Sequence, residues 1–170
     1  MKRGHMDTRV LSHLDEKGRA QMVDVTLKES SVREAIARAR IVMSPQTLAL
    51  IQEGNIPKGD VFGVARIAGI MAAKKTGELI PMCHPLELTH IAIHFFTNGE
   101  KGEILIEGQA RLVGKTGVEM EALTAVTVAG LTIYDMCKAV DKNMIMTDVM
   151  LVKKSGGKSG LFEREAEHSG

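Results

Sequence analysis

Two stretches of alternating residues, one on either side of a short turn, do most to limit how this chain can fold. In residues 88–96, Ile91 and Ile93 fall on one face of an extended chain while the two histidines fall on the other, which is the two-residue period of a half-buried strand. Residues 103–113 repeat the alternation, and the six residues between the two stretches include two glycines and an asparagine. The pattern predicts a β-hairpin and therefore an antiparallel sheet.

Apolar residues at three- and four-residue spacing predict four helices. We expect them at residues 32–43, 44–53, 60–76 and 118–142. The first follows residues 29–31, which can cap its amino end. The third is apolar on nearly every side, so we expect it to be buried. The fourth contains many β-branched residues, but its apolar residues recur with the helical period.

Two more strands complete the predicted elements. Residues 22–28 alternate apolar and polar side chains, and residues 144–152 form an apolar run that ends at a glycine-rich loop. The predicted order is β-α-α-α-β-β-α-β. Without the extra helices in the first crossover this is βαββαβ, so we predict an α+β fold with a ferredoxin-like antiparallel sheet and helices on one face.

The composition supports one domain and argues against several classes of protein. The 170 residues are 44% hydrophobic, so we expect one domain at residues 11–163, with flexible termini at residues 1–10 and 164–170. A formal charge of +1 and only four Phe and one Tyr argue against nucleic-acid binding. Because no apolar run is long enough for a membrane span and no secretory signal pattern occurs, we expect a cytoplasmic protein.

Two glycine-lysine segments are similar to a phosphate-binding P-loop, but neither has its spacing. The motif is G-x-x-x-x-G-K-[ST] between a strand and a helix. The segment ending at residues 114–116 has one residue too many after Gly108, and the segment ending at residues 157–159 has Val152 in place of the first glycine. We therefore do not expect a P-loop ATPase. The second segment is either a loop that contacts an anion or a solvated tail.

His84 lies in a turn between a predicted helix and a predicted strand, where a side chain can point into a cleft. It can act there as an acid, a base or a donor to an anion, or it can simply bond backbone groups. A zinc site that combines it with Cys83, His90 and His94 is disfavoured, because the strand separates the last two histidines and no Cys pair completes the ligands. We expect both cysteines of the chain to be reduced thiols.

The long predicted helix carries four charged residues that could do chemistry. Glu119 and Glu121 lie in its first turn, where the helix dipole favours carboxylates whatever their role. Asp135 and Lys138 are one turn apart, and such ion pairs are common on any helix. Their neighbours are mostly apolar, so we expect this pair to be partly buried, where pKa values shift and catalysis is found.

Three long segments of the chain have a distinctive sequence. They are residues 58–86, which end in MCHPL, residues 117–142, which begin GVEMEALTA, and residues 154–160, KSGGKSG. Together with KGRAQMVDVT at residues 17–26, they resemble the cyclic pyranopterin monophosphate synthase family, the C protein of molybdenum cofactor biosynthesis. The resemblance covers residues 11–163 and implies the ferredoxin-like fold that the strand and helix patterns also predict.

The resemblance implies an enzyme, a phosphorus-oxygen lyase. Its family rearranges (8S)-3′,8-cyclo-7,8-dihydroguanosine 5′-triphosphate, made by a radical enzyme, to cyclic pyranopterin monophosphate and diphosphate. Such a reaction needs proton transfer, a phosphate cradle and exclusion of water. The family also implies a homohexamer, a trimer of dimers with pockets at a subunit interface, and transient contact with the upstream radical enzyme.

The resemblance further implies which residues form the site. It implies catalytic roles for Lys58, Asp135 and Lys138. It implies substrate binding by Met82, Cys83, His84, Glu119, Met120, Glu121, Arg33 and Lys154. Arg33 and Lys154 would hold the triphosphate, the first by a planar fork and the second as a point charge.

We hypothesise that Lys58 and Lys138 relay protons while rings open and close, with Asp135 tuning one of them. A lysine acts as a base only where burial or a neighbouring cation lowers its pKa. His84 and the lysines would stabilise charge as a ribose hydroxyl attacks the α-phosphorus and diphosphate leaves. We expect no obligate metal or other cofactor, although Mg²⁺ could arrive with the triphosphate.

Two other functions stay open at this point. The first is a non-catalytic oligomer that holds a nucleotide in the same basic pocket, and turnover with release of diphosphate would exclude it. The second is a metal-dependent hydrolase built on His84, His90 and His94, which would require stoichiometric metal in the purified protein.

Overall fold

The fold is described by a computed structural model, which covers residues 17, 19 and 22–165. The predicted flexible end at residues 1–10 lies outside the described residues, and so do residues 166–170. Within the part of the chain that the structure describes, no helix combines the length and apolar character that crossing a membrane requires.

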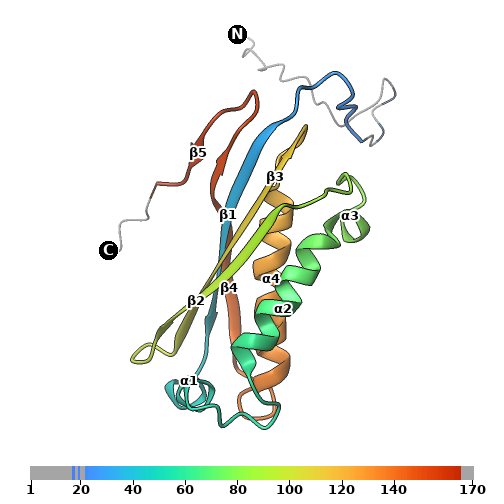
Figure 1. Cartoon of the computed structure of the whole chain (residues 1–170). Helices are drawn as coiled ribbons and strands as arrows, with labels where there is room; N and C mark the ends of the chain where they lie inside the picture. The colour runs from blue at the N-terminus through green and yellow to red at the C-terminus, as the bar shows by residue number, and fades with distance from the viewer. Residues whose placement is uncertain (1–16, 18, 20–21, 166–170) are drawn as a thin grey trace, which may run out of the picture.

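A five-stranded antiparallel sheet forms one layer of the molecule, and helices cover one of its faces (Figure 1). The strands are β1 (Ser31–Val42), β2 (His90–Asn98), β3 (Glu103–Gly114), β4 (Ile145–Ser155) and β5 (Phe162–Glu163). The helices are α1 (Pro45–Gln52), α2 (Val61–Lys74), α3 (Thr76–Leu79) and α4 (Glu119–Cys137). The order across the sheet is β2-β3-β1-β4-β5, so the predicted α+β fold with a ferredoxin-like sheet is confirmed.

Several elements lie where the sequence places them. The hairpin of β2 and β3 is confirmed, with His90 opposite Arg111 at one end and Asn98 opposite Glu103 at the turn. Helix α1 begins after Ser44, whose side chain accepts a hydrogen bond from the Thr47 amide, as an N-cap serine does. Helices α2 and α4 and strand β4 are also confirmed, although α4 ends at Cys137 rather than at residue 142.

The helix predicted at residues 32–43 is wrong, because this segment is β1, the central strand of the sheet. Every second residue from Ala35 to Ile41 is buried beneath the helices, and the residues between them face the other way. The segment also fits the helical period, and alanine favours helices. Cross-strand ion pairs such as Arg38 with Glu107, 2.7 Å apart, hold it in the sheet instead.

The strand predicted at residues 22–28 is also wrong. This segment pairs with no described strand and ends in a turn, where the Asp24 carboxylate accepts a hydrogen bond from the Thr26 amide. Its alternation is nevertheless real, since Val23 and Val25 are half-buried between exposed residues. They pack against a cleft rather than against a neighbouring strand.

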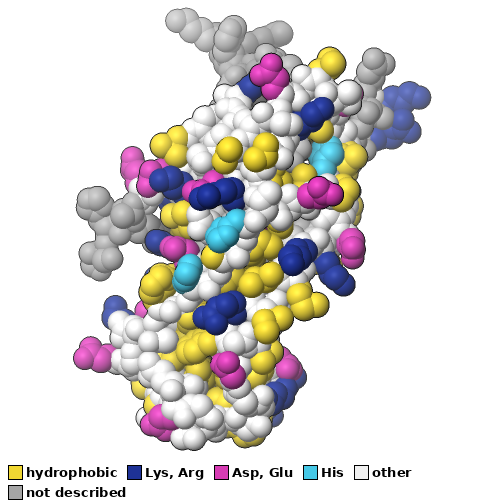
Figure 2. Space-filling model, in the orientation of Figure 1, with side chains coloured by type: hydrophobic (Ala, Val, Ile, Leu, Met, Phe, Trp, Pro, Cys, Tyr) yellow, Lys and Arg dark blue, Asp and Glu magenta, His cyan; other side chains and the backbone are white. Residues whose placement is uncertain are grey.

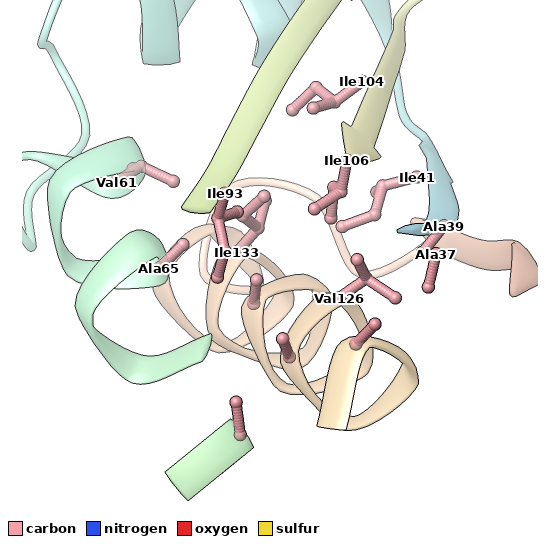
Figure 3. Close-up of a cluster of buried hydrophobic side chains, with 14 of the residues drawn as sticks. Ala37, Ala39, Ile41, Val61, Ala65, Ile93, Ile104, Ile106, Val126 and Ile133 are labelled. Atoms are coloured by element: carbon pink, nitrogen blue, oxygen red, sulfur yellow. The ribbon is translucent and has the colours of Figure 1, made fainter. Parts of the chain in front are cut away.

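The core lies between the sheet and the two long helices (Figure 3). Small residues let the layers approach closely: a Cβ on Gly69 of α2 would overlap Ile93 and lie 2.7 Å from the Ala125 carbonyl oxygen of α4. The prediction that α2 is a buried helix is correct for the side that faces the core and wrong for the outer side. Val64, Ile67 and Met71 are 45–61% exposed on its outer side, and Figure 2 shows hydrophobic side chains at the surface there.

Candidate active site

A cleft of about 1100 Å³ lies where the amino end of α4 meets the start of β1 and the ends of β3 and β4. Chain segments that are far apart in sequence line it. All eight residues predicted to bind substrate are among them: Arg33, Met82, Cys83, His84, Glu119, Met120, Glu121 and Lys154. The structure therefore brings this part of the predicted site together within one chain.

The loop after α3 carries Met82, Cys83 and His84 to one wall of the cleft. The His84 Nε2 lies 3.0 Å from the Val23 carbonyl oxygen. Because a carbonyl oxygen only accepts hydrogen bonds, Nε2 carries the proton, and Nδ1 is the atom that can accept in a neutral ring. The segment at residues 22–28 thereby fixes the orientation of the imidazole.

Glu121 is a buried carboxyl at the base of the cleft. It is only 3% exposed, and burial, together with the nearby Glu119, raises its pKa to about 7. Burial and the charge of Glu121 also raise the pKa of the Cys83 thiol. Near neutral pH, Glu121 can therefore hold or release a proton, whereas Cys83 stays a thiol.

Two cations at the other side of the cleft have defined partners. Arg33 donates from Nε to the Gly114 carbonyl oxygen at 3.2 Å and from Nη2 to the Lys115 carbonyl oxygen at 3.2 Å. Lys154 Nζ lies 3.3 Å from a Glu119 carboxylate oxygen and donates to Ser159 Oγ at 2.7 Å. Both side chains keep further N–H donors for a ligand.

Further polar residues line the cleft beyond those predicted as site residues. Lys115, Thr116, Lys158 and Ser31 also line it, and the hydroxyls of Thr116 and Ser31 are buried with no hydrogen-bond partner among the described residues. The sequence held a signal for Lys115, Thr116 and Lys158, although not for Ser31. The two segments that lack the P-loop spacing, Gly-Lys-Thr at the end of β3 and Gly-Lys-Ser after β4, both reach this cleft.

The three residues predicted to be catalytic form a second cluster at the carboxyl end of α4. Asp135 lies 2.7 Å from Lys58 Nζ and 2.6 Å from Lys138 Nζ. The two lysines lower the pKa of Asp135 to about 2, and Asp135 raises the pKa of Lys138. Asp135 and Lys138 are both exposed residues, with 55% and 53% of their side-chain surface accessible, so the prediction that they are partly buried is wrong for the single chain.

The two clusters lie far apart in one subunit. Asp135 follows Glu121 by 14 residues of helix, which at 1.5 Å per residue is about 21 Å. The site predicted from the sequence is therefore divided between the two ends of α4 within one chain. Of the proposed zinc ligands, His84 faces the cleft while His90 and His94 lie on β2. Among the described residues, no group of three or more His, Cys, Asp or Glu side chains is arranged to hold a metal ion.

Comparison with known proteins shows which family the sequence matches. The sequence model of the MoaC family matches residues 22–157, most of the chain. The chain belongs to the MoaC family.

Relatives within the MoaC family are similar over nearly their whole length. The cyclic pyranopterin monophosphate synthase of Pelotomaculum thermopropionicum is 62% identical over 159 residues, which are 94% of either chain. The protein of the same name from Desulfatibacillum aliphaticivorans is 64% identical over 154 residues, 91% of this chain and 97% of the relative. That from Heliobacterium modesticaldum is 58% identical over 155 residues, 91% of this chain and 98% of the relative.

The MoaC match covers both clusters. Every predicted site residue, from Arg33 to Lys154, lies inside the matched range. The match also includes Gly156 and Gly157 and stops before Lys158.

Proposed function

We propose that this chain is a cyclic pyranopterin monophosphate synthase, a lyase that rearranges (8S)-3′,8-cyclo-7,8-dihydroguanosine 5′-triphosphate and releases diphosphate. The general role, that of an enzyme of molybdenum cofactor biosynthesis, follows from membership of the MoaC family and from relatives that are named as synthases. The substrate and the roles of the residues are the proposal.

The observation that carries the proposal is the cleft at the amino end of α4. It combines a cationic side, with Arg33 and Lys154, and a buried carboxyl, Glu121, that can exchange a proton near neutral pH. A substrate with a polyphosphate chain at one end and a hydrogen-bonding ring at the other suits this division. The amino end of helix α4 has no side-chain cap, and the positive end of its dipole faces the carboxyls of Glu119 and Glu121 in its first turn.

In the proposed reaction, Arg33 and Lys154 neutralise the phosphates and stabilise the diphosphate as it leaves. Lys138 and Lys58 act as proton donors. Between the two lysines, Lys138 is the less suited to act as a base, because Asp135 raises its pKa. Any Mg²⁺ enters as part of the substrate and not as a resident metal.

A second copy of the chain completes the proposed site. Val64, Ile67 and Met71 of α2, with Leu131 of α4, form an exposed apolar stripe along the helices, which we call the helix-face stripe. A two-fold axis through the middle of this stripe sets two α4 helices antiparallel. The Lys58–Asp135–Lys138 cluster of one subunit then lies near the cleft of the other. The proposed assembly is a dimer of this kind, with three dimers in a hexamer.

The test is anaerobic incubation of the protein with the cyclised dihydroguanosine triphosphate, followed by measurement of pterin formation and diphosphate release. Wild-type turnover that Lys58→Ala abolishes would support the proposal. Binding of the substrate without product by a folded oligomer would contradict it and favour the nucleotide-binding alternative.

A further inference from the structure

The loop between β4 and β5 contains the glycine- and lysine-rich segment that the sequence left undecided between an anion-binding loop and a solvated tail. It lies against the start of β1. Gly156, Gly157 and Gly160 have positive φ angles of 94°, 72° and 63°, which glycine adopts at low cost. The loop therefore follows a specific path, in which three glycines adopt the left-handed backbone conformation, and does not behave as a structureless tail.

Gly157 lies directly on the guanidinium of Arg33. A Cβ at this position would overlap Nη1 and lie 2.5 Å from Cζ. On its other side, the guanidinium donates to the carbonyl oxygens of Gly114 and Lys115. The guanidinium is thus held between the end of β3 and the backbone of the loop, and any side chain at residue 157 would push it out of this place.

The same loop also positions the second cation of the cleft. Ser159 Oγ accepts a hydrogen bond from Lys154 Nζ at 2.7 Å, and Glu119 lies 3.3 Å from the same nitrogen. Next to Gly157, a Cβ on Gly156 would overlap the Val32 carbonyl oxygen, so the loop follows β1 closely. One turn of chain thereby fixes two cationic groups that project into the cleft from different strands.

We propose that Gly157 is a positioning residue, which orients the Arg33 guanidinium toward the phosphate chain of the substrate by letting the loop close over it. This inference rests on the proposed function and deepens it. A guanidinium that donates along one edge to two carbonyl oxygens and is packed against the Gly157 backbone has lost rotational freedom before the ligand binds, so its remaining donors meet a phosphate without further ordering.

The experiment compares Gly157→Ala with Gly160→Ala. Both residues have positive φ and belong to one loop, but a Cβ on Gly160 has no atom within 4 Å. Both substitutions therefore carry similar backbone strain, and only the first displaces Arg33. We expect Gly157→Ala to weaken binding of inorganic tripolyphosphate about tenfold and to lower kcat/KM by at least the same factor, because Arg33 both holds the phosphates and stabilises the leaving diphosphate. Gly160→Ala should leave both constants near wild type.

A double-mutant cycle separates positioning from a general structural role. In an Arg33→Ala background, Gly157→Ala has no guanidinium to displace, so it should not weaken tripolyphosphate binding further. Three results would each overturn the inference. They are wild-type affinity for tripolyphosphate in Gly157→Ala, an equal loss of affinity in Gly160→Ala, and an undiminished effect of Gly157→Ala in the Arg33→Ala background. If wild type binds tripolyphosphate with this pattern but does not turn over the substrate, the proposed function fails and the positioning of Arg33 stands.

Discussion

Two carboxyls on α4 have pKa values that shift in opposite directions, for different physical reasons. Glu121 is buried, and desolvation raises its pKa to about 7. Asp135 is exposed and lies between two lysines, which lower its pKa to about 2. At neutral pH, Asp135 is therefore a fixed negative charge, whereas Glu121 is partly protonated. The chemistry assigned to each residue follows from this difference.

The raised pKa of Glu121 makes a prediction about stability. The folded chain holds the proton more tightly than the unfolded chain, so stability falls as the pH rises from about 4.5 to about 7. Glu121→Gln removes this dependence. When the pH rises from 5 to 8, the free energy of unfolding of wild type should fall by up to about 3 kcal/mol relative to that of Glu121→Gln. Urea unfolding at both pH values, at one fixed protein concentration, measures the difference.

Glu87→Gln is the control for this measurement, because Glu87 is an exposed residue in the same loop as His84. It should follow wild type at both pH values. If the free energy of unfolding changed by the same amount in Glu121→Gln and in wild type between pH 5 and pH 8, the result would contradict the buried, proton-binding role of Glu121.

Asp135 makes a different prediction, since it anchors both lysines while being exposed. Asp135→Asn should reduce turnover by about a hundredfold or more, because Lys58 and Lys138 lose the carboxylate that orients them. The free energy of unfolding should change little. Asp148→Asn, which disturbs an exposed ion pair with Arg40 on the sheet, should leave turnover unchanged. Equal activity of the two variants would remove Asp135 from the proposed machinery.

At the level of the elements, the contact between α2 and α4 depends on small residues. Gly69→Ala would place a methyl group against Ile93 and against the backbone of α4. We expect a loss of about 1–3 kcal/mol, the usual cost of overpacking a filled core. Gly99→Ala in the β2–β3 turn meets no atom within 4 Å and should be nearly neutral. Thermal unfolding of both variants checks the contact, and a stable Gly69→Ala would contradict it.

The elements also show what the sequence predicts and where it fails. The β2–β3 hairpin and α1, α2 and α4 follow from local periodicity and caps, and the structure confirms them. The prediction for β1 fails because its alanines favour a helix, while its ion pairs in the sheet are made with Glu103 and Glu107, more than 60 residues away. The strand predicted at residues 22–28 is absent because an alternating pattern shows that one side of a segment is covered, but does not show whether a neighbouring strand or another part of the fold covers it. The two-residue strand β5 is too short to leave a pattern.

The candidate site divides in the same way. The resemblance supplied the residue types, and all eight predicted substrate-binding residues line one cleft. The separation of this cleft from the Lys58–Asp135–Lys138 cluster has no counterpart in the sequence, because it depends on the direction of α4 within the fold. The resemblance predicts Glu121 as a substrate-binding residue, but its burial has no signal in the sequence because it depends on tertiary packing.

For the whole molecule, the helix-face stripe predicts an obligatory dimer. Leu131→Glu places a charge in the middle of the proposed interface, where Leu131 is 55% exposed in the single chain. We expect smaller assemblies by sedimentation and loss of turnover, because each cleft would lack the partner's lysines. Leu161→Glu is the matched control, since Leu161 is 63% exposed but lies beside β5, away from the helices. Active, fully assembled Leu131→Glu would show that the interface lies elsewhere.

The most direct test of the shared site mixes Lys58→Ala and His84→Ala, two variants that we expect to be inactive on their own. The first lacks a residue of the cluster at the carboxyl end of α4, and the second lacks a residue of the cleft. If each site combines the cleft of one subunit with the cluster of its partner, mixed dimers contain one intact site. Refolding an equal mixture should then restore about a quarter of wild-type activity. A mixture that stays inactive, although mixed dimers form, would contradict a site shared between two copies of this chain.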